Sequence, residues 1–267
     1  MRAPCIALLT DFGEADYFVA SLKGVMLGIN PKAVLVDISH SVPAFDIRAG
    51  AFVLAAACRY FPQRTIFLSI VDPGVGSKRK ILLVRANRYD FIAPDNGLLS
   101  PALARERAWR AWSIENTRYS LPGPSRTFEG RDKMAPAAAR LSLGADPASF
   151  GPPVGDIMRW NAPEPRVGAA AITGEILYAD KYGNLTTNIP GEKLVALAAG
   201  APGGRLEALV GARKIGEPRD NYAAARKGEV FFLVGSLGLV EIAAREASAR
   251  RKLGAAPGDR VRIARHG

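Results

Sequence analysis

The sequence predicts an α/β protein with two domains: an N-terminal α/β domain with a mainly parallel sheet, and a smaller C-terminal domain that is mostly β. Two observations lead to this prediction. In the first half of the chain, short aliphatic runs alternate with longer segments of helical spacing, which is typical of a sheet covered by helices. In the second half, short strand-like runs are separated by glycine and asparagine turns.

Four buried strands are predicted in the N-terminal domain. Runs of β-branched and aliphatic residues, several of which end at an acidic residue, are typical of buried parallel strands. These runs are residues 6–9, 34–36, 66–71 and 81–84. Between them, residues 16–29 and 47–61 have apolar side chains at helical spacing, so we expect two helices that cover the sheet.

A change in composition separates the two domains. Glycine and proline are frequent between residues 143 and 166, where they prevent long regular elements and predict a linker. We therefore place the domains at residues 1–160 and 161–267. The second domain is predicted to contain four strands and one helix, at residues 169–179, 205–210, 229–234 and 260–263 and near 242–253 respectively.

Length and composition restrict the class of protein. The 267 residues suit two domains with a core each, and no apolar run approaches the roughly 20 residues that cross a bilayer. The first apolar stretch meets Asp11 before a signal peptide could be completed. The two cysteines, Cys5 and Cys58, cannot build a disulfide framework or a multi-cysteine metal site. A cytoplasmic protein without a membrane span is expected.

The formal net charge of +11 would suit a nucleic-acid ligand if the basic residues were clustered. Much of the excess lies between residues 245 and 265, among alanine and aliphatic residues rather than aromatic ones. This distribution favours a solvated surface over a nucleic-acid site.

Carboxylates directly after the predicted strands are the first candidates for ligand binding, because α/β sheets bind ligands beyond the carboxyl ends of their strands. Asp11 follows the first strand, where it could hold a ribose diol or cap a helix. Asp72 opens a glycine-containing loop that also carries Arg79, so the two could form an ion pair. This loop lacks the glycine spacing of dinucleotide and phosphate loops.

Three further motifs combine charged and amide side chains. Residues 93–97 form a good turn by composition alone. Residues 127–132 carry Glu129 just before a predicted helix at 135–143, so capping or a surface charge pair would also explain them. Asn184, within residues 180–188, offers the donor and acceptor that the edge of adenine requires, although a hairpin turn is the simpler interpretation.

In this order, the motifs resemble those of the S-adenosylmethionine hydroxide adenosyltransferases, also called S-adenosylmethionine hydrolases, whose relatives include the bacterial fluorinase and chlorinase. The resemblance spans nearly the whole chain. It rests on residues 10–13 with Asp16, 23–24, 36–40, 71–76 with Arg79, 93–97, 127–132, 135–136, 183–184 and 240–243. It implies an N-terminal α/β domain, a C-terminal β-barrel-like domain and a homotrimer with nucleotide sites between neighbouring subunits.

The resemblance also implies a reaction, in which water attacks the ribose C5′ of S-adenosylmethionine and releases adenosine and methionine. The family pairs an aspartate and an arginine with a histidine, and the first two map onto Asp72 and Arg79. Glu129 stands at the place of the histidine, while His40 and His266 lie elsewhere. Two hypotheses follow: a hydrolase with Glu129 as third catalytic residue, and a catalytically impaired protein that binds S-adenosylmethionine or adenosine.

By the same resemblance, five residues bind the substrate. Asp11 would hold the ribose hydroxyls, Phe45 would cover the sugar and Asn184 would hold adenine, with Asp180 and Ser236 at the methionine end. A carboxylate at position 72 would repel a halide, which favours water as nucleophile. S-adenosylmethionine is then a substrate, and no cofactor or metal is expected.

Overall fold

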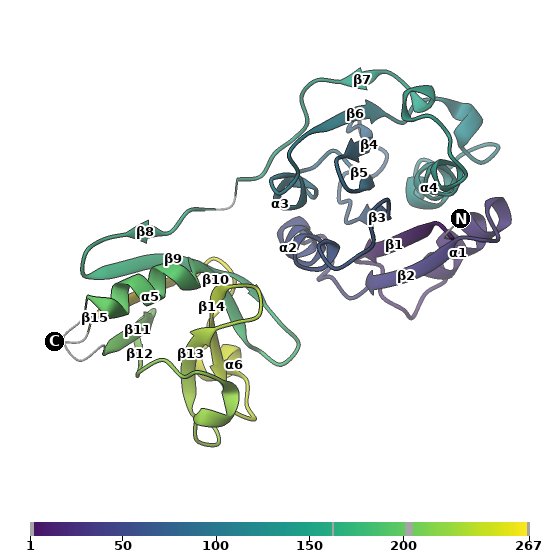
Figure 1. Cartoon of the computed structure of the whole chain (residues 1–267). Coiled ribbons are helices and arrows are strands. Elements are labelled where there is room, and N and C mark those ends of the chain that lie inside the picture. The colour runs from purple at the N-terminus through teal and green to yellow at the C-terminus, as the bar shows by residue number, and fades with distance from the viewer. Residues whose placement is uncertain (1–2, 162, 201–204, 266–267) are drawn as a thin grey trace. The chain divides into compact units, whose positions relative to one another are not determined.

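The computed structural model describes residues 3–161, 163–200 and 205–265. The chain divides into two compact units, Met1–Asn161 and Ala162–Gly267, whose elements are labelled in Figure 1.

The first unit contains a seven-stranded sheet in the order β2-β1-β3-β5-β4-β6-β7. β1 pairs in parallel with β2 and β3, and β3 pairs in parallel with β5. The prediction of an N-terminal α/β domain with a largely parallel sheet is confirmed. The prediction that residues 34–36 are buried is wrong, because β2 is an edge strand and Val34 is exposed. The strands are β1 (Cys5–Thr10), β2 (Val34–Ser39), β3 (Ile66–Ile70), β4 (Ile81–Ala86), β5 (Asp90–Pro94), β6 (Trp109–Ser113) and β7 (Pro153–Val154).

Residues 81–84 do not form the parallel strand that their aliphatic run predicts, because β4 is antiparallel to both β5 and β6. Only residues 87–89 separate β4 from β5, and so short a connection can join only antiparallel neighbours. The prediction of a linker over 143–166 is also wrong in part. β7 pairs with β6, and Phe150 is fully buried in the core of the first unit.

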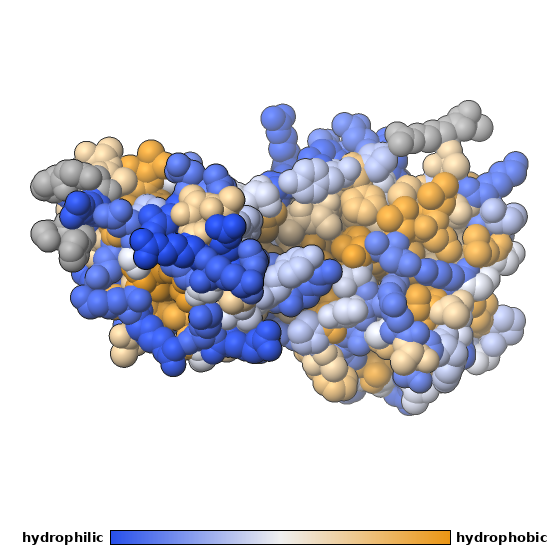
Figure 2. Space-filling model, turned by 90° about the horizontal axis from the view of Figure 1, so that it is seen from below, coloured by the Kyte–Doolittle hydropathy of each residue, from blue (hydrophilic) through white to orange (hydrophobic). Residues whose placement is uncertain are grey.

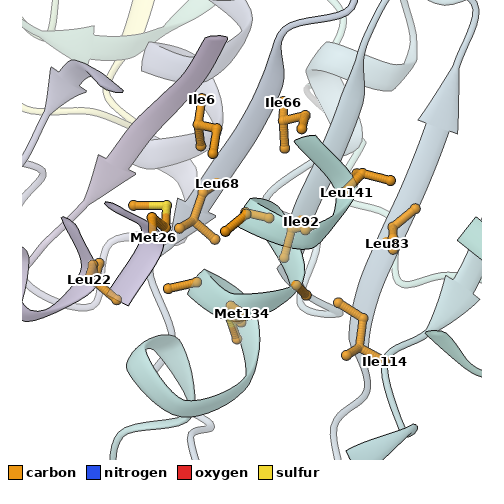
Figure 3. Close-up of a cluster of buried hydrophobic side chains, with 14 of the residues drawn as sticks. Ile6, Leu22, Met26, Ile66, Leu68, Leu83, Ile92, Ile114, Met134 and Leu141 are labelled. Atoms are coloured by element: carbon orange, nitrogen blue, oxygen red, sulfur yellow. The ribbon is translucent and has the colours of Figure 1, made fainter. Parts of the chain in front are cut away.

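Helices cover both faces of this sheet. α1 (Phe18–Ile29) and α4 (Ala135–Ser142) pack together on one face, and α2 (Ile47–Cys58) and α3 (Ser100–Leu103) pack together on the other (Figure 1). Figure 3 shows how Leu22 and Met26 of α1 meet strand residues such as Leu68 and Ile92 to form a buried apolar cluster. This core fixes the strand ends that carry the polar loops.

The second unit is built on an eight-stranded antiparallel sheet in the order β12-β11-β15-β9-β10-β14-β13, with β8 paired to β9. The edge strands β12 and β13 contact each other, so the sheet is nearly closed and barrel-like, as expected. Its strands are β8 (Arg166–Val167), β9 (Ala171–Ala179), β10 (Leu185–Pro190), β11 (Leu206–Val210), β12 (Arg213–Ile215), β13 (Val230–Val234), β14 (Leu239–Ala244) and β15 (Arg260–Arg265).

Among the described residues, the α-helices that accompany this sheet are α5 (Gly191–Ala199) and α6 (Ala249–Leu253). The predicted helix near 242–253 is therefore wrong over its first half. Ile242 belongs to β14, where it is fully buried between Leu185 of β10 and Phe232 of β13. An apolar run of this length fits a buried strand as well as a helix, and cross-strand pairing decides between them.

Across residues 3–161, 163–200 and 205–265, no helix has the length and hydrophobicity that a membrane span requires. Most of the basic residues near the end of the chain are exposed, among them Arg250, Arg251, Lys252, Arg260 and Arg262. Figure 2 shows hydrophilic residues spread widely over one face of the molecule. The expectation that the excess charge is solvated stays a prediction.

Candidate active site

Two polar loops leave neighbouring parallel strands at the same edge of the first sheet. Thr10 at the end of β1 is in register with Ile70 at the end of β3, so the loops that carry Asp11 and Asp72 begin side by side. Asn96, which follows β5, donates from Nδ2 to the carbonyl oxygen of Val71 at 2.8 Å. This edge is where parallel sheets present functional side chains.

Asp72 and Arg79 form the ion pair that their loop predicts. Nε of Arg79 lies 3.1 and 3.0 Å from the two carboxylate oxygens of Asp72, and Nη2 lies 2.5 Å from Oδ2. The two side chains are only 6% and 10% exposed respectively. A forked guanidinium pair of this kind fixes both the position and the orientation of the carboxylate.

Glu129 joins the same network from a distant part of the chain. Nη2 of Arg79 also lies 2.5 Å from Oε2 of Glu129, and the backbone N–H of Gly76 donates to the same oxygen at 3.3 Å. Glu129 lies at the start of a π-helical turn, Gly130–Met134, that leads into α4. The structure thus brings together Asp72, Arg79 and Glu129, the three predicted catalytic residues.

Lys133 is a fourth member of the network that the sequence analysis missed. Its Nζ donates to Oε1 of Glu129 at 2.6 Å. The spacing is a partial signal, because a glutamate and a lysine four residues apart contact each other on a helix, but the predicted helix begins only at residue 135. Each oxygen of Glu129 therefore has its own cation, Lys133 at Oε1 and Arg79 at Oε2.

These contacts set the ionisation of the network. Burial alone would raise the pKa of Glu129, but the hydrogen bonds and charges of Lys133 and Arg79 outweigh it and hold the pKa below its ordinary value. Burial alone would likewise lower the pKa of Arg79, but Asp72 and Glu129 raise it. Glu129 is therefore an ionised acceptor near neutral pH.

Gly76 allows the Asp72 loop to approach Glu129. Its φ is +77°, and a Cβ there would lie 2.7 Å from the carbonyl oxygen of Arg126. A side chain at this position would push residue 126, and with it the segment that carries Glu129, away from the loop.

Asp72 and Glu129 line one cavity of about 350 Å³ together with Val75 and a group of aromatic rings. This volume lies near the lower end of the range for small-molecule sites. Phe18 and Phe128 meet edge to face with ring centroids 5.3 Å apart. The remaining lining residues are Phe12, Tyr17, Ile70, Thr127 and Gly130. Aromatic walls beside carboxylates suit a ligand that is planar or cationic.

Asp11 and Phe45 are also brought together. Oδ2 of Asp11 accepts a hydrogen bond from the backbone N–H of Phe45 at 2.8 Å. Phe45 has a φ of +66°, and the residue is 71% exposed. A bulky residue in this left-handed region is strained and persists only where its surroundings hold it, so the contact with Asp11 presents the ring to solvent.

In the second unit, Asp180 and Asn184 form one turn. Oδ1 of Asp180 accepts from the backbone N–H of Asn184 at 2.8 Å, and Oδ2 accepts from its Nδ2 at 3.0 Å. Both residues line a cavity of about 770 Å³ together with Tyr182, Tyr222 and other residues of this unit. Ser236 is not among the residues that line this cavity; it is exposed in the turn between β13 and β14.

Of the two histidines, the one that the structure describes lies apart from the network of Asp72. His40 is buried and contacts Thr10 through Nδ1 at 2.8 Å, and His266 lies outside the described residues. Within the described part of the chain, no group of three or more histidine, cysteine, aspartate or glutamate side chains could hold a metal ion.

Comparisons with known proteins point to the same family for both units of the chain. Residues 6–151 match the model of the SAM hydroxide adenosyltransferase N-terminal domain, and residues 174–262 match that of the C-terminal domain. A curated (R)-S-adenosyl-L-methionine hydrolase from Salinispora tropica is 38% identical, with 97% of each chain covered. A fluorinase from an Actinoplanes species is 30% identical over 70% of this chain and 72% of its own length.

The fold matches solved structures as well. A crystal structure of an uncharacterized conserved protein from Thermotoga maritima superimposes with a TM-score of 0.91 at 32% sequence identity, covering 97% of this chain and 100% of the other.

Proposed function

This chain belongs to the SAM hydroxide adenosyltransferase family, and from that premise we propose that Asp72, Arg79 and Glu129 carry out its reaction in the cavity that the two carboxylates line. The chain is an enzyme that hydrolyses S-adenosyl-L-methionine to adenosine and L-methionine. The alternative, a binding protein with impaired catalysis, is not favoured, because relatives that match nearly its full length are hydrolases. The assignment of the site rests on one observation: the guanidinium of Arg79 contacts both Asp72 and Glu129.

The chemistry needs a placed nucleophile more than an acid. The oxygen of water forms a bond to C5′ while the bond from C5′ to the sulfonium sulfur breaks, and the electron pair of that bond goes to sulfur. Methionine leaves as a neutral thioether, and the proton of the attacking water passes to a carboxylate and then to solvent. Placement of this kind contributes roughly 7 to 11 kcal/mol in well-oriented reactions.

The three side chains have separate roles. Asp72 accepts a hydrogen bond from the attacking water and directs its lone pair toward C5′, while the fork of Arg79 holds that carboxylate in one orientation. Glu129 is a second acceptor in the same cavity and takes the place of the histidine of other family members. Two carboxylates at this position disfavour an anionic nucleophile, so we propose water rather than a halide.

We propose that S-adenosylmethionine is held by the residues that the family resemblance indicates. Asp11 binds the ribose hydroxyls, and the exposed ring of Phe45 covers the sugar. Asn184 holds adenine, and the adjoining carboxylate of Asp180 attracts the ammonium group of the methionine end. Ser236 is placed at the methionine end by the resemblance alone. The substrate supplies its own leaving group, so the proposed reaction uses no cofactor or metal.

We also propose that the enzyme is a cytoplasmic homotrimer with its sites between neighbouring subunits. Large apolar side chains at and near the polar loops are exposed in the single chain, among them Tyr17, Phe45 and Val75, and exposed apolar groups of this kind mark interaction surfaces. Cys5 and Cys58 are both free thiols, which suits a reducing compartment.

The test is to incubate the protein with S-adenosylmethionine and to measure adenosine by chromatography. Wild type is expected to produce adenosine, and Asp72→Ala is expected to produce none while it still binds S-adenosylmethionine in calorimetry. Asp90→Ala is a matched control, because Asp90 forms a similar forked pair with Arg85 at another place on the sheet. Undiminished turnover by Asp72→Ala would overturn the assignment of the site.

A further inference from the structure

Building on the proposed function, we infer that Lys133 is a positioning residue for the reaction, one that keeps Glu129 an oriented, ionised acceptor in the cavity. Lys133 is not among the residues that line the cavity, so it acts on the substrate through Glu129. Its Nζ lies 2.6 Å from Oε1, the oxygen of Glu129 opposite to the one that Arg79 contacts.

The number of charges shows why a second cation is needed. Asp72 and Glu129 together carry two negative charges, and Arg79 alone supplies one positive charge to both of them. With Lys133 the four groups sum to zero. Without it, two carboxylates that are 6% and 8% exposed would share one guanidinium, and like charges held close together raise the pKa of one of the pair.

The charged groups that contact Glu129 come from two elements. Arg79 belongs to the loop after β3, and Lys133 to the helical turn that Glu129 itself begins; Asp72 reaches Glu129 only through Arg79. The backbone N–H of Gly76 is the remaining polar contact that the structure records. Lys133 is therefore the contact whose removal changes the charge at Glu129 without breaking the fork between Arg79 and Asp72.

If Lys133 had only a structural role, its removal would have a different effect. Exposed lysine and glutamate pairs four residues apart contribute little to stability and nothing to catalysis. Lys133 is 30% exposed, but its partner is 8% exposed and lines the cavity. Loss of Lys133 is therefore expected to change the protonation of Glu129. Loss of a lysine from an ordinary surface pair would have no such effect in the cavity.

The experiment compares the pH profile of kcat for adenosine formation in wild type, Lys133→Met and Lys133→Arg. In Lys133→Met, the acid limb is expected to move upward by roughly one pH unit or more, with kcat falling more than KM changes. Lys133→Arg is expected to restore the wild-type profile, because it returns a cation to Oε1. Lys214→Met is the control, since Lys214 pairs with Glu207 on the exposed surface of the second unit.

A second measurement does not depend on turnover. A carbon-13 titration of glutamate carboxyl groups, with Glu129 assigned by its absence in Glu129→Gln, is expected to show a higher pKa for Glu129 in Lys133→Met. An unchanged titration and an unchanged pH profile in a folded Lys133→Met protein would overturn the inference while wild-type activity stands. Absence of adenosine from the wild type would instead refute the proposed function, and the titration would still decide the role of Lys133.

Discussion

Nδ1 of His40 lies 2.8 Å from Oγ1 of Thr10, the residue directly before Asp11. Both side chains are buried, and the backbone N–H of Phe12 donates to the same hydroxyl at 3.2 Å. On the other side of the ring, Nε2 lies 3.0 Å from Oδ1 of Asp37, whose Oδ2 accepts from Lys23 at 2.6 Å. This chain of polar contacts holds the loop that carries Asp11 and Phe12 at the edge of the sheet.

Replacing Thr10 by valine tests this arrangement, because valine keeps the shape and removes the hydroxyl. The loss leaves Nδ1 of buried His40 without that partner, so we expect the free energy of unfolding to fall by about 1 to 3 kcal/mol. We also expect KM for S-adenosylmethionine to rise more than kcat falls, since the loop is proposed to hold the ribose. Urea denaturation and steady-state kinetics give the two values.

Thr65→Val is the matched control for this prediction. The Thr65 hydroxyl is also buried and donates to the carbonyl oxygen of Pro62 at 2.8 Å, but Thr65 directly precedes β3, whereas Thr10 is the last residue of β1. A similar loss of stability with unchanged KM is expected. An equal change of KM in both variants would show that the effect comes from general destabilisation.

Arg79→Lys tests the need for a forked cation. A lysine ammonium cannot present two fixed donors to Asp72 while it also reaches Glu129. We expect kcat to fall about 100-fold, because small displacements of a positioned group have effects of that size. Arg85→Lys, which weakens a comparable fork to Asp90, should leave kcat at the wild-type value.

Part of this site could be predicted from sequence and part could not. Asp72 and Arg79 are seven residues apart in one loop, so their contact follows from local geometry. Glu129 is fifty residues beyond Arg79, and no local pattern places the two together; only the family resemblance indicated the contact. Lys133 has a helical spacing from Glu129, but the contact could be predicted only if the helical turn at Gly130–Met134 were known, and the predicted helix begins later.

The fold, like the site, could be predicted from the sequence only in part. The aliphatic runs of β1 and β3 predict buried strands correctly, whereas the similar run of β2 forms an edge strand without buried residues. The alternation of these runs with helices predicts their parallel pairing. The run that begins at Ile81 has a similar aliphatic composition. However, β4 is antiparallel to β5, because the connection between the two strands is very short. The direction of a buried strand depends on the length of its connections, and the tight turn over 87–89 lacks the glycine that usually signals a hairpin.

Glu129→Gln is expected to change how stability depends on pH. The pKa of Glu129 is lowered in the folded protein from an ordinary value of 4.5, so its charge contributes stability above that pH, which is lost as the pH falls through the folded pKa. The glutamine variant should be less stable than wild type near neutral pH, and the difference should shrink on acidification below about pH 4.5. Urea denaturation of wild type and variant across this pH range measures the difference in stability and its change with pH.

Gly183→Ala is expected to disturb the turn that carries Asn184. The φ of Gly183 is +86°, and a Cβ there would collide with Oγ of Ser248, the residue that caps α6. Gly258→Ala is a matched control, since its φ is +94° and no atom lies within 4 Å of the added carbon. The control should cost about 1 kcal/mol from backbone strain alone. Gly183→Ala should cost more and raise KM, and equal effects would contradict the proposed role of this turn.

Glu129→His restores the residue type that the family uses, yet we expect it to lower kcat in this chain. An imidazole cannot accept from both Arg79 and Lys133, so the variant would leave Lys133 without its carboxylate and place a cation beside the sulfonium substrate. The double variant Glu129→His with Lys133→Met removes that cation and is expected to be more active than Glu129→His alone. Lys133→Met in the wild-type background is expected to lower kcat, so the same substitution would have opposite effects in the two backgrounds. Such a sign change in a double-mutant cycle shows that the two positions are coupled, and additive effects on kcat would show that they act independently.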